Sequence, residues 1–114
     1  MLVQPAESIN LVDILEARYR TEDEEAVNKW YDEFHMPVLF KSKYVRSIAR
    51  YKVPSGSPDY VRYFTILRYD SQSDFEKFLA SPEFAAAGEK SPEMRSIKIE
   101  GGPPVHGELA KEWV

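Results

Sequence analysis

The segment Tyr60–Tyr69, YVRYFTILRY, constrains the fold of this chain more than any other. It is rich in β-branched and aromatic residues and follows a turn-forming stretch, which predicts a β-strand. Its apolar side chains fall on both faces: Phe64 and Ile66 on one, and Val61, Tyr63 and Leu67 on the other. A strand with one face in water would alternate more regularly. Both faces of the sheet that contains this strand must therefore be covered.

The other predicted strands are residues 10–20, 44–53 and 95–100. The first, NLVDILEARYR, is also apolar on both faces, whereas the last, RSIKIE, alternates regularly. With a helical segment after the first strand and another after the third, the order is β-α-β-β-α-β. This order with an antiparallel sheet is the ferredoxin-like α+β arrangement, a split βαβ unit repeated once.

The first helix is expected to begin at Thr21, with Glu24 completing a capping box. Its apolar residues recur at helical spacing and are Val27, Trp30, Tyr31, Phe34 and Val38. Pro37 has no N–H to offer the carbonyl of Glu33, so this helix should end or kink near His35.

The second helix should begin at Ser71 or Ser73 and restart at Ser81, with Pro82 at its first helical position. We expect one core between the helices and the sheet. Its predicted members are Trp30, Phe34, Val38, Phe64, Ile66, Phe75, Phe78 and Leu79.

The length of 114 residues predicts one domain, residues 1–114. Residues 1–9 are interpreted as an N-terminal extension and residues 103–114 as a C-terminal tail, which is either a short strand or an arm. The helices cover one face of the sheet, and a sheet from a second copy is the simplest cover for the other. The sequence therefore predicts a homodimer in the manner of the dimeric α+β barrels.

Several classes of function are disfavoured by the composition. The chain has no cysteine, which removes disulfides, thiolate catalysis and cysteine metal sites. Two histidines without ligand spacing predict no metal, and no motif predicts a cofactor. The net charge is −4 with scattered basic residues, so nucleic acid is not an expected partner. No apolar stretch suits a membrane span or a leader peptide, and we expect a cytoplasmic protein.

Several motifs occur together in an order that is familiar. Residues 30–37, WYDEFHMP, resemble the W-Y-D-E-x-H-x-P segment of a branch of the EthD-like proteins, within the dimeric α+β barrel superfamily. Residues 44–51, YVRSIARY, resemble the next strand of that branch, and residues 56–60 and 79–84 resemble its hairpin and second helix. The resemblance covers residues 11–84. It implies relatives such as cofactor-free monooxygenases, muconolactone isomerases, polyketide cyclases, fatty-acid dehydratase-like proteins and haem enzymes, as well as members without a clear activity.

His35 is the candidate catalytic residue, because histidine exchanges protons near neutral pH. It falls at the edge of the apolar helix face, where it could reach a cavity between the helix and the sheet. The end of the helix would raise its pKa modestly and favour an acid role. The alternative is structural, in which His35 donates a hydrogen bond to a backbone carbonyl freed by Pro37.

Tyr31 and Tyr51 are the candidate substrate-binding phenols, since a phenol can hold a carbonyl or enolate oxygen. Trp30, Phe34 and Phe64 are interpreted as pocket wall or core. Arg46 and Arg50 share a strand face and could meet a substrate carboxylate, or pair with acidic residues of a second subunit.

Two classes of function follow. One is a cofactor-independent enzyme that performs acid–base chemistry of the isomerase, cyclase or lyase type on a small apolar molecule, aromatic-derived or polyketide-like. A cofactor-free monooxygenase is a variant of it. The other is a non-catalytic protein that binds a small ligand or is associated with stress.

Overall fold

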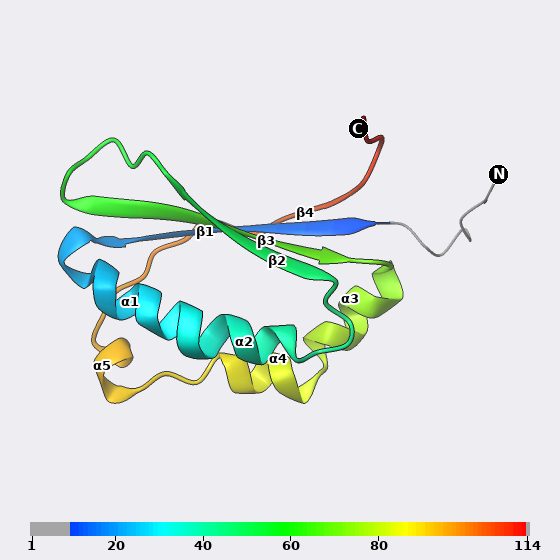
Figure 1. The fold of residues 1–114 in the computed structure, drawn as a ribbon, viewed down its shortest axis with the longest axis horizontal. Coiled ribbons are helices and arrows are strands. Elements are labelled where there is room, and N and C mark those ends of the chain that lie inside the picture. The colour runs from blue at the N-terminus through cyan, green and yellow to red at the C-terminus, as the bar shows by residue number, and fades with distance from the viewer. Residues whose placement is uncertain (1–9, 114) are drawn as a thin grey trace.

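The computed structural model describes residues 10–113 and shows a four-stranded sheet with all its helices on one face (Figure 1). The proposed N-terminal extension, residues 1–9, lies outside the described residues. The strands are β1 (Leu11–Arg20), β2 (Ser47–Val53), β3 (Tyr60–Tyr69) and β4 (Val105–Glu108). The helical segments are η1 (Thr21–Asp23), α1 (Glu24–Trp30), η2 (Tyr31–His35), α2 (Met36–Phe40), α3 (Gln72–Leu79), α4 (Pro82–Ala87) and α5 (Pro92–Arg95).

The strand order is β2-β3-β1-β4, and every neighbouring pair is antiparallel. This is the ferredoxin-like topology that the order of elements predicts. β1 and β3 pair along their whole lengths, from Leu11 opposite Tyr69 to Arg20 opposite Tyr60. The β2–β3 hairpin turns at Gly56, whose positive φ of 79° suits glycine.

The first helical run continues through Pro37 instead of ending there. α1 passes into a π-helical turn, η2, and α2 follows with Pro37 in its first turn. The Met36 N–H bonds to the carbonyl of Tyr31, five residues back, and this wider turn accommodates the proline. The predicted capping box is wrong, because Thr21 and Glu24 make no cap and Thr21 Oγ1 instead donates to the carbonyl of Pro58 at 2.7 Å.

The strand predicted at residues 95–100 is also wrong. Ser91 caps α5 by accepting a hydrogen bond from the Met94 N–H, so the start of that segment is helical. Only Glu100 pairs with the sheet, through two backbone hydrogen bonds to Arg18. The fourth strand is β4, which lies in the predicted tail. The chain reaches it past Gly101, where a Cβ atom would collide with the carbonyl oxygen of Glu16.

Two apolar clusters, not one, fill the space between the helices and the sheet. One is centred on Leu67, Tyr69 and Phe78 under α2, α3 and α4, and the other on Tyr19, Val27 and Tyr63 under α1. The predicted core needs correction for four residues. Phe34 belongs to neither cluster and borders a surface cavity near α5 instead. Phe64 and Ile66 alternate with the buried residues of β3 and so lie on the other face of the sheet, and Leu79 is exposed.

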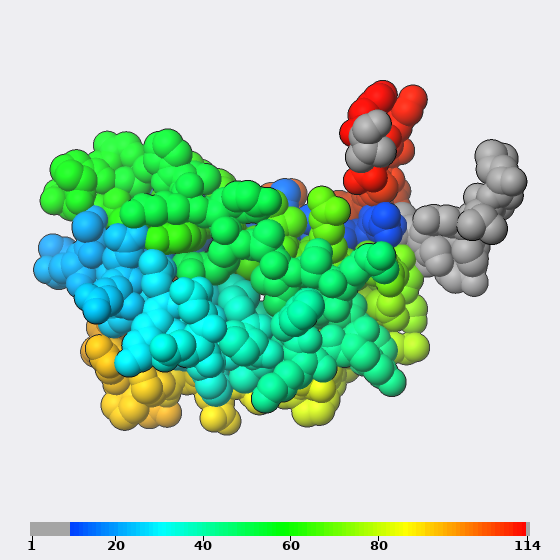
Figure 2. Space-filling view, in the orientation of Figure 1, coloured from blue at the N-terminus to red at the C-terminus, as the bar shows by residue number. Residues whose placement is uncertain are grey.

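The face of the sheet opposite the helices carries Ile14, Phe64 and Ile66, which remain partly exposed. The described residues place no helix on this face (Figure 1). Figure 2 shows the tail after β4 standing out from the body of the molecule on this side. We call this side of the sheet, with Ile14, Phe64 and Ile66 at its centre, the open face. Among the described residues, no helix is long and apolar enough to cross a membrane.

Candidate functional site

Arg50 forms the centre of a polar cluster between α1 and the sheet. Its guanidinium lies between two aromatic rings, 4.1 Å from the ring centroid of Tyr31 and 4.3 Å from that of Tyr63. Its Nη2 donates to the hydroxyl of Tyr19 at 3.0 Å and to Oδ1 of Asn28 at 3.2 Å. The side chain is only 13% exposed, so a permanent positive charge is held almost entirely inside the protein.

Asn28 connects this arginine to the tyrosines. The Tyr19 hydroxyl donates to Asn28 Oδ1 at 2.7 Å, and Asn28 Nδ2 donates to the Tyr63 hydroxyl at 2.9 Å. The Tyr63 hydroxyl in turn donates to a carboxylate oxygen of Glu24 at 2.5 Å. Burial raises the pKa of the Tyr19, Tyr31 and Tyr63 phenols, so these groups are neutral near pH 7. They can stabilise charge by hydrogen bonds, but they are not available as bases.

His35 lies beside the cluster with its ring stacked on Trp30, at a centroid distance of 4.5 Å. Its Nδ1 is 2.6 Å from the carbonyl oxygen of Ala87, so Nδ1 carries the proton and donates it. Nε2 has no hydrogen-bond partner among residues 10–113 and keeps its lone pair. The rings of Tyr31 and His35 are perpendicular, with their centroids 5.3 Å apart, and Tyr31 thus lies in contact with both the histidine and Arg50.

The protonation state of His35 differs from the sequence-based expectation. Burial lowers its pKa, and this outweighs the opposing effect of the hydrogen bond to Ala87; Lys90 and Arg50 lower the pKa further. The histidine is therefore neutral near pH 7 and suited to accept a proton, not to act as an acid at rest. The hydrogen bond to a backbone carbonyl does exist, but the acceptor is Ala87 at the end of α4 and not the carbonyl freed by Pro37.

The π-helical turn η2 sets the position of His35. Its five residues end at His35, and α2 begins with Met36 immediately afterwards. A π-helical turn shifts the register of the side chains that follow it, and such turns occur often at functional sites.

A groove of about 560 Å³ runs between this helical run and β2, the edge strand of the sheet. Its wall is mostly apolar, and Arg50 lies in it with Asp32 nearby. The residues that line it are Asp32, Met36, Pro37, Phe40, Ser47, Ile48 and Arg50. His35 is adjacent in sequence to Met36 but is not itself part of the lining.

The candidate site residues predicted from the sequence lie in separate parts of the structure. Trp30, Tyr31 and His35 form one cluster on the helix side. Tyr51 and Phe64 lie opposite each other on neighbouring strands and on the open face, because Tyr51 follows the inward-pointing Arg50. They cannot share a cavity with His35 within one chain.

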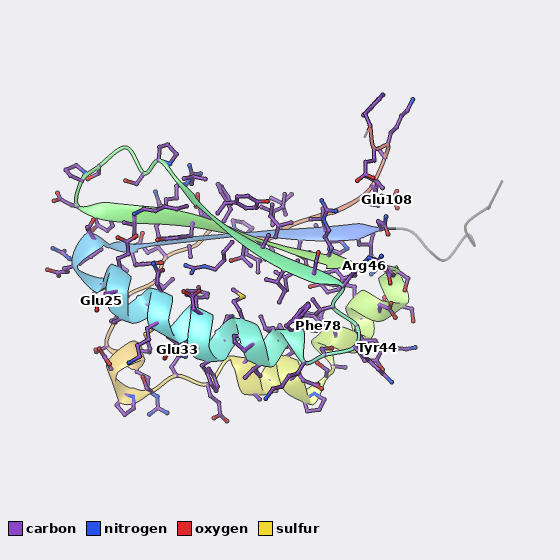
Figure 3. All side chains as sticks on the ribbon, viewed as in Figure 1. Glu25, Glu33, Tyr44, Arg46, Phe78 and Glu108 are labelled. Carbon is purple, nitrogen blue, oxygen red and sulfur yellow. The ribbon has the colours of Figure 1, made fainter. Side chains whose placement is uncertain are left out.

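Two further side chains lie away from the cluster. Phe34 borders a shallow cavity of about 230 Å³ near α5, on the outer side of the helix. Arg46 does not join Arg50, since it pairs with Asp70 at 3.1 Å. It lies just before β2 (Figure 3).

The sequence reasoning did not find the role of Arg50, Asn28 and Tyr19. Strand alternation was the available signal, because Arg50 is two residues from Ile48 and shares its face. A second pair was also missed: His106 Nδ1 contacts Asp13 Oδ1 at 2.5 Å, and Asp13 also accepts a hydrogen bond from Tyr69. Within residues 10–113, no group of three histidine or acidic residues could hold a metal ion.

Solved structures share this fold. A dimeric ferredoxin-like protein from an uncultured marine organism matches with a TM-score of 0.60 at 16% identity, over 92% of this chain and 99% of that one. A putative antibiotic biosynthesis monooxygenase from Nitrosomonas europaea matches with a TM-score of 0.59 at 13% identity, over 96% of each chain. An ethyl tert-butyl ether D (EthD) family protein from Bacillus halodurans C-125 matches with a TM-score of 0.55 at 17% identity, over 82% of this chain and 97% of that one.

These likenesses confirm the ferredoxin-like fold of the dimeric α+β barrel proteins. They do not single out the EthD-like branch, because proteins of other kinds match as well. No protein-family model matches the sequence, and no curated protein is significantly similar to it.

Proposed function

We propose that the protein is a cofactor-independent enzyme that performs acid–base chemistry on a small apolar molecule bound in the groove between the helical run and β2. The reaction is of the isomerase, cyclase or lyase type, and the substrate is aromatic-derived or polyketide-like. The observation that carries this proposal is a neutral histidine, His35, with its free nitrogen as acceptor, joined through Tyr31 to the buried positive charge of Arg50.

The chemistry follows from these three side chains. In this proposal the His35 ring, one residue from the groove-lining Met36, must turn past Tyr31 to meet the bound molecule. Its Nε2 then accepts a proton from a carbon atom beside a carbonyl group, and the negative charge that develops moves to the carbonyl oxygen. The neutral phenol of Tyr31 stabilises that oxygen, and the positive charge of Arg50 against the Tyr31 ring favours the developing negative charge. Return of the proton to another atom gives isomerisation, attack by the carbanion gives cyclisation, and departure of a neighbouring group gives elimination.

Two alternatives use the same groove. A cofactor-free monooxygenase would begin with the same proton removal, and the likeness to a putative antibiotic biosynthesis monooxygenase favours this variant. A protein that binds a small ligand without catalysis is favoured by the packing of His35 against Trp30 and its bond to Ala87, which together fix the ring as a structural side chain would be fixed.

We further propose that the protein is a homodimer in which two open faces pack together. Ile14 and Ile66 are directly opposite each other on neighbouring strands at the centre of this face, and Phe64 lies beside them. An exposed apolar patch of this kind at the centre of a sheet face is unfavourable in water and is expected to be covered, with charged residues such as Glu16 and Arg62 beside it. The likeness to a dimeric ferredoxin-like protein supports this arrangement. In such a dimer Tyr51 and Phe64 would lie in the interface, apart from the groove.

Proton exchange tests the catalytic proposal without knowledge of the natural substrate. 1-Phenylpropan-2-one and α-tetralone exchange their acidic C–H protons slowly in D₂O, and NMR can follow the exchange. The protein should accelerate exchange, and His35→Gln should reduce the acceleration by about 10²–10⁴-fold. His106→Gln is the matched control and should leave the rate unchanged. His106 contacts Asp13 where β4 pairs with β1, away from the groove. Equal rates for wild type and His35→Gln would support the non-catalytic reading instead.

A further inference from the structure

We propose that Arg50 is the recognition site for a carboxylate, so that the molecule in the groove is a small carboxylic acid with an apolar body. This inference rests on the proposed function, because it names the class of molecule that the same groove accepts.

The hydrogen-bonding groups of Arg50 are not all satisfied by the protein. Nη2 is fully engaged by Tyr19 and Asn28. Nε is buried and has no acceptor among the described residues. Nη1 is 3.7 Å from Asp32, which is beyond hydrogen-bonding distance. A charged donor without a close acceptor is costly, and Nη1, which lies nearest the groove residue Asp32, is the donor that a bound molecule could satisfy.

The charge of Arg50 is also poorly balanced. Tyr19 and Asn28 are neutral, and the carboxylate of Asp32 is the single acidic group paired with Arg50 in residues 10–113. The Asp32 side chain is 70% exposed, so water screens most of its attraction. By contrast, Arg62 holds Glu16 at 2.5 Å and Arg46 holds Asp70 at 3.1 Å. Arg50 is thus a nearly buried cation without a close anion.

The aromatic rings of Tyr31 and Tyr63 fix the plane of the guanidinium from its two sides. The Nη1 end of this fixed group can donate a charge-assisted hydrogen bond to one oxygen of a carboxylate. The groove reaches Arg50 beside Asp32, and the rest of its wall includes Met36, Phe40 and Ile48. An acid with an aliphatic or aromatic body would place its carboxylate at Arg50 in place of Asp32 and its apolar part along these side chains.

The test compares 4-phenylbutanoate with 4-phenylbutanamide, which has nearly the same shape but no charge. Binding is followed by NMR on wild-type protein, with the Arg50 side-chain Nε–H signal and the Ile48 and Met36 methyl signals as reporters. We expect the acid to bind about tenfold or more tightly than the amide, the scale of a charge-assisted hydrogen bond. The acid alone should shift the Arg50 Nε–H signal strongly.

Variants separate recognition from a structural role. Asp32→Asn removes the competing carboxylate and should tighten binding of the acid several-fold without affecting the amide. Glu33→Gln is the matched control, because Glu33 is the next residue but faces away from the sheet and outside this groove (Figure 3). Arg50→Lys should lower the preference for the acid about tenfold, since lysine keeps the charge but loses the Nη1 donor that the flat guanidinium holds in place. The comparison on wild type and Asp32→Asn needs no change at Arg50 itself, so it remains decisive if the arginine variant does not fold.

The outcomes distinguish this inference from the function on which it depends. If both compounds shift Ile48 and Met36 with equal affinity, the groove is a binding site but Arg50 does not recognise a carboxylate, and the inference is wrong. If the acid binds elsewhere, with shifts confined to the open face, the inference is also wrong. If neither compound perturbs the groove, the proposed function fails together with it.

Discussion

Replacing Asn28 with alanine should lower the free energy of unfolding by about 2–4 kcal/mol, because this side chain links α1 to the sheet at the candidate site. Oδ1 of Asn28 accepts hydrogen bonds from the Tyr19 hydroxyl at 2.7 Å and from Arg50 Nη2 at 3.2 Å. Its Nδ2 donates to the Tyr63 hydroxyl at 2.9 Å. Alanine removes all three hydrogen bonds at once.

The magnitude follows from the type of each bond. The two bonds to tyrosine are neutral and contribute about 1 kcal/mol each, and the bond from the charged Arg50 contributes about 1.5–3 kcal/mol. Two effects reduce the total. Tyr19 still bonds to Arg50 and Tyr63 still bonds to Glu24, so neither hydroxyl is left alone. Alanine also has a higher helix propensity than asparagine by about 0.7 kcal/mol or less.

Urea unfolding monitored by circular dichroism measures this change, with every variant at the same protein concentration in case unfolding is coupled to dissociation. Lys29→Ala is the control, because Lys29 is the next residue of α1 and is exposed. It should change stability by less than about 0.5 kcal/mol. A loss below about 1 kcal/mol for Asn28→Ala would refute the view that this polar cluster holds α1 on the sheet.

Two other predictions concern the open face and the histidine. Wild-type protein should scatter light as a dimer of the 13.2 kDa chain, and Ile66→Lys should give a monomer with unchanged circular dichroism, whereas a wild-type monomer at micromolar concentration would exclude the dimer. In an NMR titration, His35 should titrate below its ordinary pKa of 6.5, since burial disfavours the charged ring. The folded state then binds the proton less readily than the unfolded chain, so the contribution of His35 to stability is complete above about pH 6.5 and is lost as the pH falls toward the lower folded-state pKa. His35→Gln should lack this acid-side loss, and a titration midpoint above the ordinary value would show that burial does not dominate.

The local pattern of the sequence determined the central strands and the helix of the candidate site. β3 has the predicted bounds and β1 differs by one residue, because a strand's alternation and its β-branched residues are properties of neighbouring positions. Ser71 caps α3 as one of the two predicted starting points. The fold class followed from the order of these elements and from apolar residues on both strand faces.

The same local patterns were misleading where contacts distant in sequence compete with them. Residues 95–100 alternate like a strand, but the Ser91 cap makes their start helical, and Ile97 and Ile99 pack against the cluster under α1. Pro37 does not end its helix. The chain forms a π-helical turn just before it, in which the Met36 N–H bonds to the carbonyl of Tyr31, and the helical run continues into α2.

The candidate site depended on tertiary structure for a comparable reason. The sequence identified His35, yet its protonation state is set by burial and by Ala87, a residue 52 positions away. From the sequence, Arg50 was expected to bind either a substrate carboxylate or acidic residues of a partner subunit. Only the register of β2 against β3, together with the position of α1 above them, places its guanidinium between Tyr31 and Tyr63. Residue types and spacing specify which side chains can do chemistry, whereas burial, charge balance and the contacts of each donor arise when separate elements pack together.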